Sequence, residues 1–130
     1  MPEERTDRGA LAGPARVRSR GDWGRGHRHV IVHDDSMRPT LRPGDRLDVD
    51  LGAYRDRAPV PGEIVVVRDP EEAGRLIVKR VESVGESGVF VVGDDRSRSR
   101  DSRAFGPVPL HALVGRAVRC YAPAERRREL

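Results

Sequence analysis

Short runs of alternating apolar and polar residues fill most of the chain, and turn-forming residues separate them. Strict alternation over four to eight residues is typical of β-strands, whereas a helix repeats its apolar positions every three to four residues. The predicted strands are 29–33, 46–51, 63–68, 75–84, 88–94 and 112–123. In the second strand, Leu47, Val49 and Leu51 are predicted to share one face. This pattern favours a mostly β fold, a small folded-over or barrel-like antiparallel sheet.

The loop HDDSMRPTLRPGD (33–45) separates the first two strands and holds a candidate reactive group, the hydroxyl of Ser36. Met37 and Leu41 are apolar residues of this loop, and we expect them to anchor it against the core. Pro39 is tolerated in the first turn of a helix, so a turn or two of helix is predicted to begin near Ser36.

The two ends of the chain are too polar to be expected in the core. Residues 1–27 hold six arginines, four acidic residues and five glycines, a composition that predicts a disordered arm. The charged tail 124–130 is interpreted in the same way. The remaining residues, 28–123, are predicted to form one compact domain, which is long enough to fold alone.

Composition and charge argue against several classes of protein. The net charge is +4, and no basic stripe is interleaved with aromatic residues, so we expect no nucleic-acid partner. The longest run of large apolar residues is four. A spanning helix needs about 20, and no signal peptide is recognisable. Together with a single cysteine, Cys120, these features predict a soluble cytoplasmic protein without a membrane anchor.

Three of the four histidines, His27, His29 and His33, fall within seven residues. Their spacing matches no zinc-binding pattern, so neither a metal site nor another cofactor is expected. Weak incidental affinity for a metal ion is the alternative.

Lys79 is the only lysine of the chain, which otherwise carries 24 arginines. An arginine keeps its proton in proteins, whereas burial lowers the pKa of a lysine and can leave its amine neutral. On the predicted strand 75–84, Lys79 shares a face with Ile77 and Val81, so it emerges from an apolar surface. The position is a candidate general base. The alternative is a lysine whose stem covers the core while its amine reaches water.

Ser36 and Lys79 have the chemistry of a catalytic pair. A serine hydroxyl is a weak nucleophile until a neighbouring base takes its proton, and Ser–Lys pairs are an established variant of this chemistry. Such a pair needs a pocket with little water, because a solvated amine stays protonated at neutral pH. The alternative for the segment around Ser36 is an ordinary capped turn packed by its own apolar residues.

Three segments in order, DSMRPTLRPGDRLDVD, RLIVKRVESVG and GDDRSRSRDSRAFG, resemble the serine–lysine peptidases of the signal peptidase I family, which is related to LexA-type repressors. The resemblance covers residues 30–120. It implies a serine endopeptidase with the fold of signal peptidases and of the LexA C-terminal domain. Within it, Ser36 corresponds to the nucleophile and Lys79 to the general base.

The resemblance also implies roles for residues around this pair. Ser99 corresponds to the serine whose hydroxyl positions the lysine amine. Asp101 and Arg103 resemble an ion pair that holds this segment near the site, with Arg80 as a further member. The alternative is a surface ion pair that contributes little to stability. The matching segments also include Met37 after the nucleophile and two glycines expected to serve backbone turns, Gly93 and Gly106.

Two positions depart from the family pattern. Family members usually carry serine or glycine two residues before the nucleophile, where it helps to form the oxyanion hole, but here that residue is Asp34. An ionised carboxylate would repel a developing oxyanion, and losing one donor costs on the order of 3 kcal/mol. Either Asp34 points away, or the N–H of Ser36 supplies most of the stabilisation. Asp95 replaces the asparagine of a Gly-Asp-Asn segment, and modest activity is expected.

Within the family, the small size and the lack of an anchor resemble the soluble maturation proteases of nickel-type superoxide dismutase from actinobacteria and cyanobacteria. This resemblance implies that the partner is a precursor protein, nickel superoxide dismutase, from which an N-terminal leader is removed. It implies no metal and no cofactor for the protease itself. The oligomeric state is left open.

Three alternatives fit the same residues. The first is general signal peptidase processing together with a membrane partner. The second is a LexA-type regulatory domain that cleaves only itself, with Ala12–Gly13 as a suitable bond, although twelve preceding residues are too few for a DNA-binding domain. The third is a non-catalytic binding module with a vestigial Ser–Lys pair, for which Asp34 is the strongest argument.

Overall fold

The structure is a computed structural model, and it describes residues 26–130. Almost all of the predicted arm 1–27 therefore lies outside the described residues. His27, however, already belongs to the first strand, and its ring Nδ1 lies 2.9 Å from a carboxylate oxygen of Asp48 in the second strand. The folded domain thus includes the last residue assigned to the arm.

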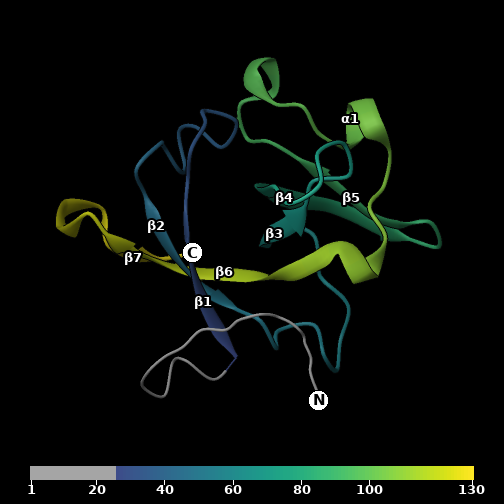
Figure 1. The fold of residues 1–130 in the computed structure, drawn as a ribbon, viewed down its shortest axis with the longest axis horizontal. Coiled ribbons are helices and arrows are strands. Elements are labelled where there is room, and N and C mark those ends of the chain that lie inside the picture. Colours follow the sequence, from purple (N-terminus) through teal and green to yellow (C-terminus); the bar gives the residue numbers. More distant parts are fainter. Residues whose placement is uncertain (1–25) are drawn as a thin grey trace.

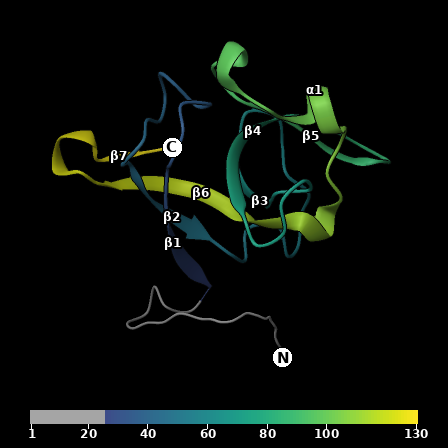
Figure 2. The ribbon, with the colours of Figure 1, turned by 45° about the horizontal axis from the view of Figure 1, so that its top comes forward.

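Within the described residues, seven antiparallel strands form one open sheet (Figure 1). In chain order they are β1 (His27–Ile31), β2 (Arg46–Asp50), β3 (Ile64–Arg68), β4 (Leu76–Gly85), β5 (Gly88–Val92), β6 (Leu113–Ala122) and β7 (Arg128–Glu129). Their order across the sheet is β1-β2-β6-β3-β4-β5, and β7 pairs with β6. The long β6 joins β2 to β3 across the molecule (Figures 1 and 2). The predicted mostly β antiparallel fold is confirmed, although the sheet is not closed into a barrel.

Short helical segments occur in the connections, namely η2 (Arg96–Arg98), α1 (Ser102–Phe105), η3 (Leu110–Ala112) and η4 (Ala124–Arg126). The helix predicted near Ser36 is not formed. That segment makes turns instead, one of them closed by the N–H of Leu41 and the carbonyl of Met37 at 2.9 Å. Pro39 disfavours the helical conformation of the preceding Arg38, which explains the difference. No helix among residues 26–130 has the length and apolar character needed to cross a membrane.

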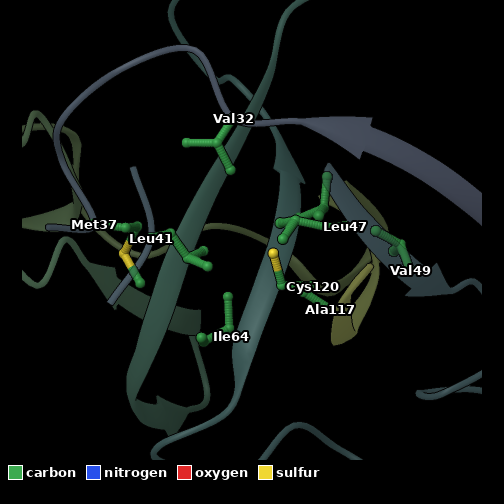
Figure 3. Close-up of a cluster of buried hydrophobic side chains, with 9 residues drawn as sticks. Val32, Met37, Leu41, Leu47, Val49, Ile64, Ala117 and Cys120 are labelled. Atoms are coloured by element: carbon green, nitrogen blue, oxygen red, sulfur yellow. The ribbon is translucent and has the colours of Figure 1, made fainter. Parts of the chain in front are cut away.

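Successive side chains of β3 enter two separate hydrophobic clusters. Ile64 and Val66 belong to the first cluster, and Val65 and Val67 belong to the second. The first cluster also contains Val32, Met37, Leu41, Leu47, Val49, Ala117 and Cys120 (Figure 3). The sheet is therefore buried on both faces, which explains why β3 is apolar at four consecutive positions instead of alternating.

The structure corrects two expectations about which residues reach the core. Leu51 is 40% exposed, because β2 ends one residue earlier. The charged tail 124–130 is part of the folded domain: β7 pairs with β6, and Leu130 packs against the first cluster. The charge of Arg126 in this tail is balanced by the buried carboxylate of Asp45, at 2.6 Å. The prediction from polar composition that this tail is disordered is therefore wrong.

Candidate active site

The loop 33–45, called the serine loop below, is anchored in the first hydrophobic cluster. Met37 is 1% exposed and Leu41 is fully buried, and both side chains lie in the core (Figure 3). Ser36 itself is only 2% exposed. Packing of its neighbours thus fixes the position of the candidate nucleophile and limits its contact with water.

Asp34 contacts Ser36 directly. Its carboxylate oxygen Oδ1 accepts a hydrogen bond from the Ser36 hydroxyl at 2.9 Å and another from the Ser36 N–H at 3.1 Å. Its other oxygen is 3.7 Å from the guanidinium group of Arg75. The structure therefore contradicts the alternative in which Asp34 points away. The hydroxyl and the N–H, the two groups of Ser36 that acyl transfer requires, are both engaged by this carboxylate.

Lys79 occupies a buried position on β4. It is 2% exposed and lies between Ile77 and Val81, which are 7% and 2% exposed on the same face of the strand. Burial lowers the pKa of the Lys79 amine, while the negative charges of Asp34 and Asp101 oppose part of this effect. Burial therefore makes the amine easier to deprotonate, which is what a general base requires.

A chain of hydrogen bonds orients the Lys79 amine. Its Nζ donates to the Ser99 Oγ at 3.0 Å, and the Ser99 hydroxyl donates to the Asp101 Oδ2 at 2.6 Å. Because Ser99 has one hydroxyl proton and gives it to Asp101, its oxygen can only accept from Lys79. The lone pair of a neutral Lys79 amine must then point away from Ser99.

Asp101 anchors this chain. Its carboxylate is 1% exposed and accepts hydrogen bonds from the Arg103 Nε at 2.9 Å and from the Gly93 N–H at 2.8 Å. It also caps the N-terminus of α1 by accepting from the backbone N–H of Arg103. Although burial opposes the effect, these hydrogen bonds hold the pKa of Asp101 well below its usual range. Asp101 therefore stays charged and keeps Ser99 in place.

Arg80 does not join the Asp101 ion pair, and that expectation is wrong. Its guanidinium group forms two hydrogen bonds with Asp94, at 2.8 and 2.7 Å. Because successive residues of a strand face opposite sides, Arg80 cannot follow Lys79 toward Asp101. Asp94 also accepts a hydrogen bond from the Thr40 hydroxyl at 2.6 Å. The pair therefore ties β4 to the serine loop.

Gly93 lies where the two sides of the site meet. A Cβ atom at this position would lie 2.3 Å from the Ser99 Oγ and 2.5 Å from the carbonyl oxygen of Ser36. The glycine thus allows close approach of two segments and does not serve the expected turn, whereas Gly106 does, with a φ of 82°. The N–H of Asp95 donates to the same Ser36 carbonyl at 2.9 Å. This segment therefore joins the serine loop to Ser99.

The structure brings Ser36 and Lys79 to one site without a bond between them. The Ser36 hydroxyl donates to Asp34 and the Lys79 amine donates to Ser99, and no hydrogen bond joins Ser36 to Lys79 in the described part of the chain. The carboxylate that accepts from Ser36 also acts electrostatically on Lys79. Proton transfer from Ser36 to Lys79 therefore requires Asp34 to release the hydroxyl first.

A groove of about 560 Å³ borders the serine loop and is lined by residues 28–34, Met37 and residues 75–78. The stretch 76–79 of β4 pairs with β3, but the pairing of β4 with β5 begins only at Arg80. One edge of this stretch therefore has backbone groups to which an extended peptide can add.

The clustered histidines of β1 make contacts within the sheet. His27 contacts Asp48, and the ring of His29 packs on Tyr121 with centroids 4.2 Å apart. Among residues 26–130, no group of three or more His, Cys, Asp or Glu side chains is arranged to hold a metal ion.

A buried serine beside a buried, oriented lysine amine defines a site suited to acyl transfer. The sequence matches the signal peptidase, peptidase S26 family over residues 27–85 and 81–122, and the chain belongs to this family of serine endopeptidases.

Relatives in curated collections support this assignment. The chain is 37% identical over 114 residues to the mitochondrial ATP-independent inner membrane protease subunit 1b of Arabidopsis thaliana, across 68% of this chain and 66% of that protein. It is 28% identical to the probable signal peptidase I-1 of Synechocystis sp., across 73% and 71% of the two chains. It is also 28% identical to signal peptidase I of Leptolyngbya laminosa, across 76% and 70%. The alignments thus span 66 to 71% of the lengths of these relatives.

Sequence reasoning does not identify the roles of Thr40, Asp94 and Arg126. For Asp94 a signal exists, because the alternation of β4 places Arg80 opposite Lys79 and an arginine on that face needs its own carboxylate. For Thr40 and Arg126 the sequence offers no local signal, since their partners are 54 and 81 residues away.

Proposed function

We propose that this chain removes an N-terminal leader from a precursor protein, with Ser36 as the nucleophile and Lys79 as the general base. The observation that carries the proposal is the buried Lys79 amine, held by Ser99 and Asp101 at the same site as Ser36. Such an arrangement provides a base that is both oriented and easily deprotonated, which is what a serine nucleophile needs.

The reaction begins when Asp34 releases the Ser36 hydroxyl. The Ser36 Oγ bonds to the scissile carbonyl carbon as its proton passes to the Lys79 Nζ, and the resulting oxyanion faces the Ser36 N–H. Lys79 next gives this proton to the leaving amine, so that the C–N bond breaks and the acyl group stays on Ser36. A water molecule that loses a proton to Lys79 attacks the acyl carbon, and the released Ser36 oxygen regains a proton from Lys79.

We infer that the leader binds as an extended strand in the groove beside β1 and β4. Asp34 and Met37, which line this groove, lie on either side of Ser36 in the serine loop, so a peptide bound there lies beside the proposed nucleophile. Pairing with the free edge of residues 76–79 would supply backbone hydrogen bonds, and alternate side chains would enter the groove.

The proposed substrate is the precursor of nickel superoxide dismutase, and the proposed site of action is the cytoplasm. The substrate is supported by the small size of the chain, in which it resembles the maturation proteases of that enzyme. The compartment is supported by Cys120, which is buried and unpaired, as is usual where thiols stay reduced.

Co-expression with a nickel superoxide dismutase precursor tests this proposal. We expect a shortened dismutase with a new N-terminal sequence when the chain is intact, and full-length precursor when it carries Ser36→Ala. A precursor that stays uncleaved would refute the proposed substrate. An acylating inhibitor that labels the intact chain but not Ser36→Ala would still show a reactive serine, so the two parts of the proposal can fail separately.

The names of the relatives favour a second candidate, the processing of precursors at a membrane. The Arabidopsis relative is a subunit of an inner membrane protease, and other relatives are named thylakoidal processing peptidases. Cell fractionation separates the two candidates, because this one requires the chain and its activity to sediment with membranes. Activity recovered in the supernatant would argue against it.

A further inference from the structure

We propose that the C-terminal segment 124–130 positions the serine loop for catalysis, with Arg126 as the main positioning residue. The inference rests on the proposed role of Ser36. It goes beyond that role, because this segment contains none of the proposed reactive groups. The segment 124–130 also lies outside the part of the chain that matches the family, which ends at residue 122.

Arg126 holds the C-terminal end of the serine loop through Asp45. Its guanidinium group forms two hydrogen bonds with the Asp45 carboxylate, at 2.6 and 2.9 Å. Asp45 is 1% exposed and also accepts from the N–H of Arg42 at 3.1 Å, within the same loop. A bidentate pair with a buried carboxylate is geometrically restrictive, and an unpaired buried charge is strongly unfavourable. This contact therefore fixes where the loop enters β2.

The same segment also contacts the middle of the loop. Arg126, at 3.4 Å, and Arg128 both donate to the carbonyl oxygen of Thr40. On its other side, the Thr40 hydroxyl donates to Asp94, which pairs with Arg80 of β4. In Figures 1 and 2 the yellow C-terminal segment lies beside the end of β2 that the serine loop enters. The loop is thus held between the C-terminal segment and the strand that carries Lys79.

These contacts reach the proposed nucleophile through the turn 37–41, which contains Thr40. The N–H of Leu41 donates to the carbonyl of Met37 at 2.9 Å, and Met37 is next to Ser36. A displacement of about 1 Å at a reacting group can reduce the rate about 100-fold. Loss of the C-terminal contacts would leave Met37 and Leu41 in the core but would release the polar half of the loop.

The test uses the full chain with two matched double variants. Asp45→Asn with Arg126→Gln removes the ion pair without leaving a buried charge unpaired. Glu63→Gln with Arg57→Gln removes another pair with two hydrogen bonds, at 2.7 and 3.2 Å, that contacts neither the serine loop nor the C-terminal segment. Steady-state cleavage and amide hydrogen exchange are measured on both variants and on the unmodified chain, well below their unfolding temperatures.

For the Asp45/Arg126 variant we expect kcat to fall at least about tenfold with KM within about twofold, because loop position matters to the reacting atoms more than to peptide binding. The Leu41 amide should exchange at least about tenfold faster. The Glu63/Arg57 variant should keep both kcat and the Leu41 exchange rate even if its stability falls. Equal kcat and equal Leu41 exchange in the two variants would overturn the inference, as would a change in KM alone. If the unmodified chain cleaves no precursor, the proposed function fails, and Leu41 exchange alone decides whether the segment positions the loop.

Discussion

The serine side and the lysine side of the site are held by different kinds of interaction. The serine loop is anchored by Met37 and Leu41 in the first hydrophobic cluster and by the ion pair of Asp45. The Lys79 amine is oriented by a single chain of hydrogen bonds through Ser99. The side chains that flank it on β4 belong to the second cluster. The proposed nucleophile and the proposed base therefore depend on separate hydrophobic clusters that meet at the candidate active site.

This difference indicates what each side contributes. Apolar packing fixes where a group lies but tolerates small rotations, whereas hydrogen bonds weaken steeply when their angles change. The serine side thus determines the position of Ser36. The lysine side determines the orientation and the protonation state of the Lys79 amine. Substitutions near Lys79 should change kcat more than the free energy of unfolding, while substitutions in the serine loop should change both quantities.

The largest effect is expected for Lys79→Arg. An arginine keeps its proton, so a variant that preserves positive charge at this position should be as inactive as Lys79→Ala. General bases contribute about 100-fold to 10,000-fold, and both variants should lose at least that much. Cleavage rates of the purified proteins, with circular dichroism to verify folding, provide the measurement. Turnover by Lys79→Arg well above that of Lys79→Ala would refute the base assignment.

Gly93→Ala should disturb both sides at once. The added Cβ would lie within 2.5 Å of the Ser36 carbonyl oxygen and the Ser99 side chain, and overpacking of this kind costs about 1–3 kcal/mol. We expect kcat to fall about 100-fold, because both reactive groups must shift. Thermal unfolding and cleavage should be measured together.

Gly85→Ala is the matched control for Gly93→Ala. An added Cβ at Gly85 would meet no atom within 4 Å, and the backbone there is not left-handed. This control should keep its activity and stability. Equal behaviour of the two variants would show that the two sides are not in tight contact at Gly93.

Ser99→Ala should affect the lysine side alone. The variant loses the oxygen that accepts from Lys79 but keeps the Gly93 and Arg103 hydrogen bonds to Asp101. We expect kcat to fall about tenfold to 100-fold, because the Lys79 amine loses its orientation for proton transfer. KM should change little, because this amine is not proposed to bind the substrate. The free energy of unfolding should fall by only about 1 kcal/mol.

Ser97→Ala provides a close control for Ser99→Ala. The Ser97 hydroxyl also donates to an aspartate two residues away, Asp95, at 2.7 Å, but on the exposed surface. Its removal should leave kcat unchanged. A similar loss in both variants would mean that the effect comes from the local turn and not from the orientation of Lys79.

Much of the lysine side could be predicted from the sequence, because its determinants are local. Alternation along residues 75–84 places Lys79 between Ile77 and Val81, and the structure buries all three. The resemblance to the family indicates the contact of Ser99 with Lys79 and the pair of Asp101 with Arg103, and the structure shows both. The hydrogen bond between Ser99 and Asp101 was not predicted. The mostly β antiparallel fold follows from the same local signals, since short alternating runs and turn residues delimit its strands.

The serine side was predicted less completely, because its supports are distant in sequence. Arg126 pairs with Asp45 across 81 residues, and the composition of its segment indicates solvent exposure. The contact of Asp34 with Ser36 spans only two residues but depends on backbone angles that composition does not determine. Pattern reasoning therefore works where alternation decides burial and fails where a charged side chain finds a partner far along the chain.

The smallest effect is expected for Asp34, and it is a gain. Asp34→Ser removes the acceptor that engages the Ser36 hydroxyl and N–H, so kcat/KM at neutral pH should rise about threefold to tenfold. Asp34→Asn keeps an acceptor but removes a negative charge that raises the pKa of Lys79. Because the reaction needs neutral Lys79, activity rises with pH through this pKa, and its acid limb should move to lower pH in both variants. The pH–rate profiles of kcat/KM measure both effects. A profile for Asp34→Ser that lies below that of the unmodified chain at every pH would show that Asp34 assists Ser36 and does not restrain it.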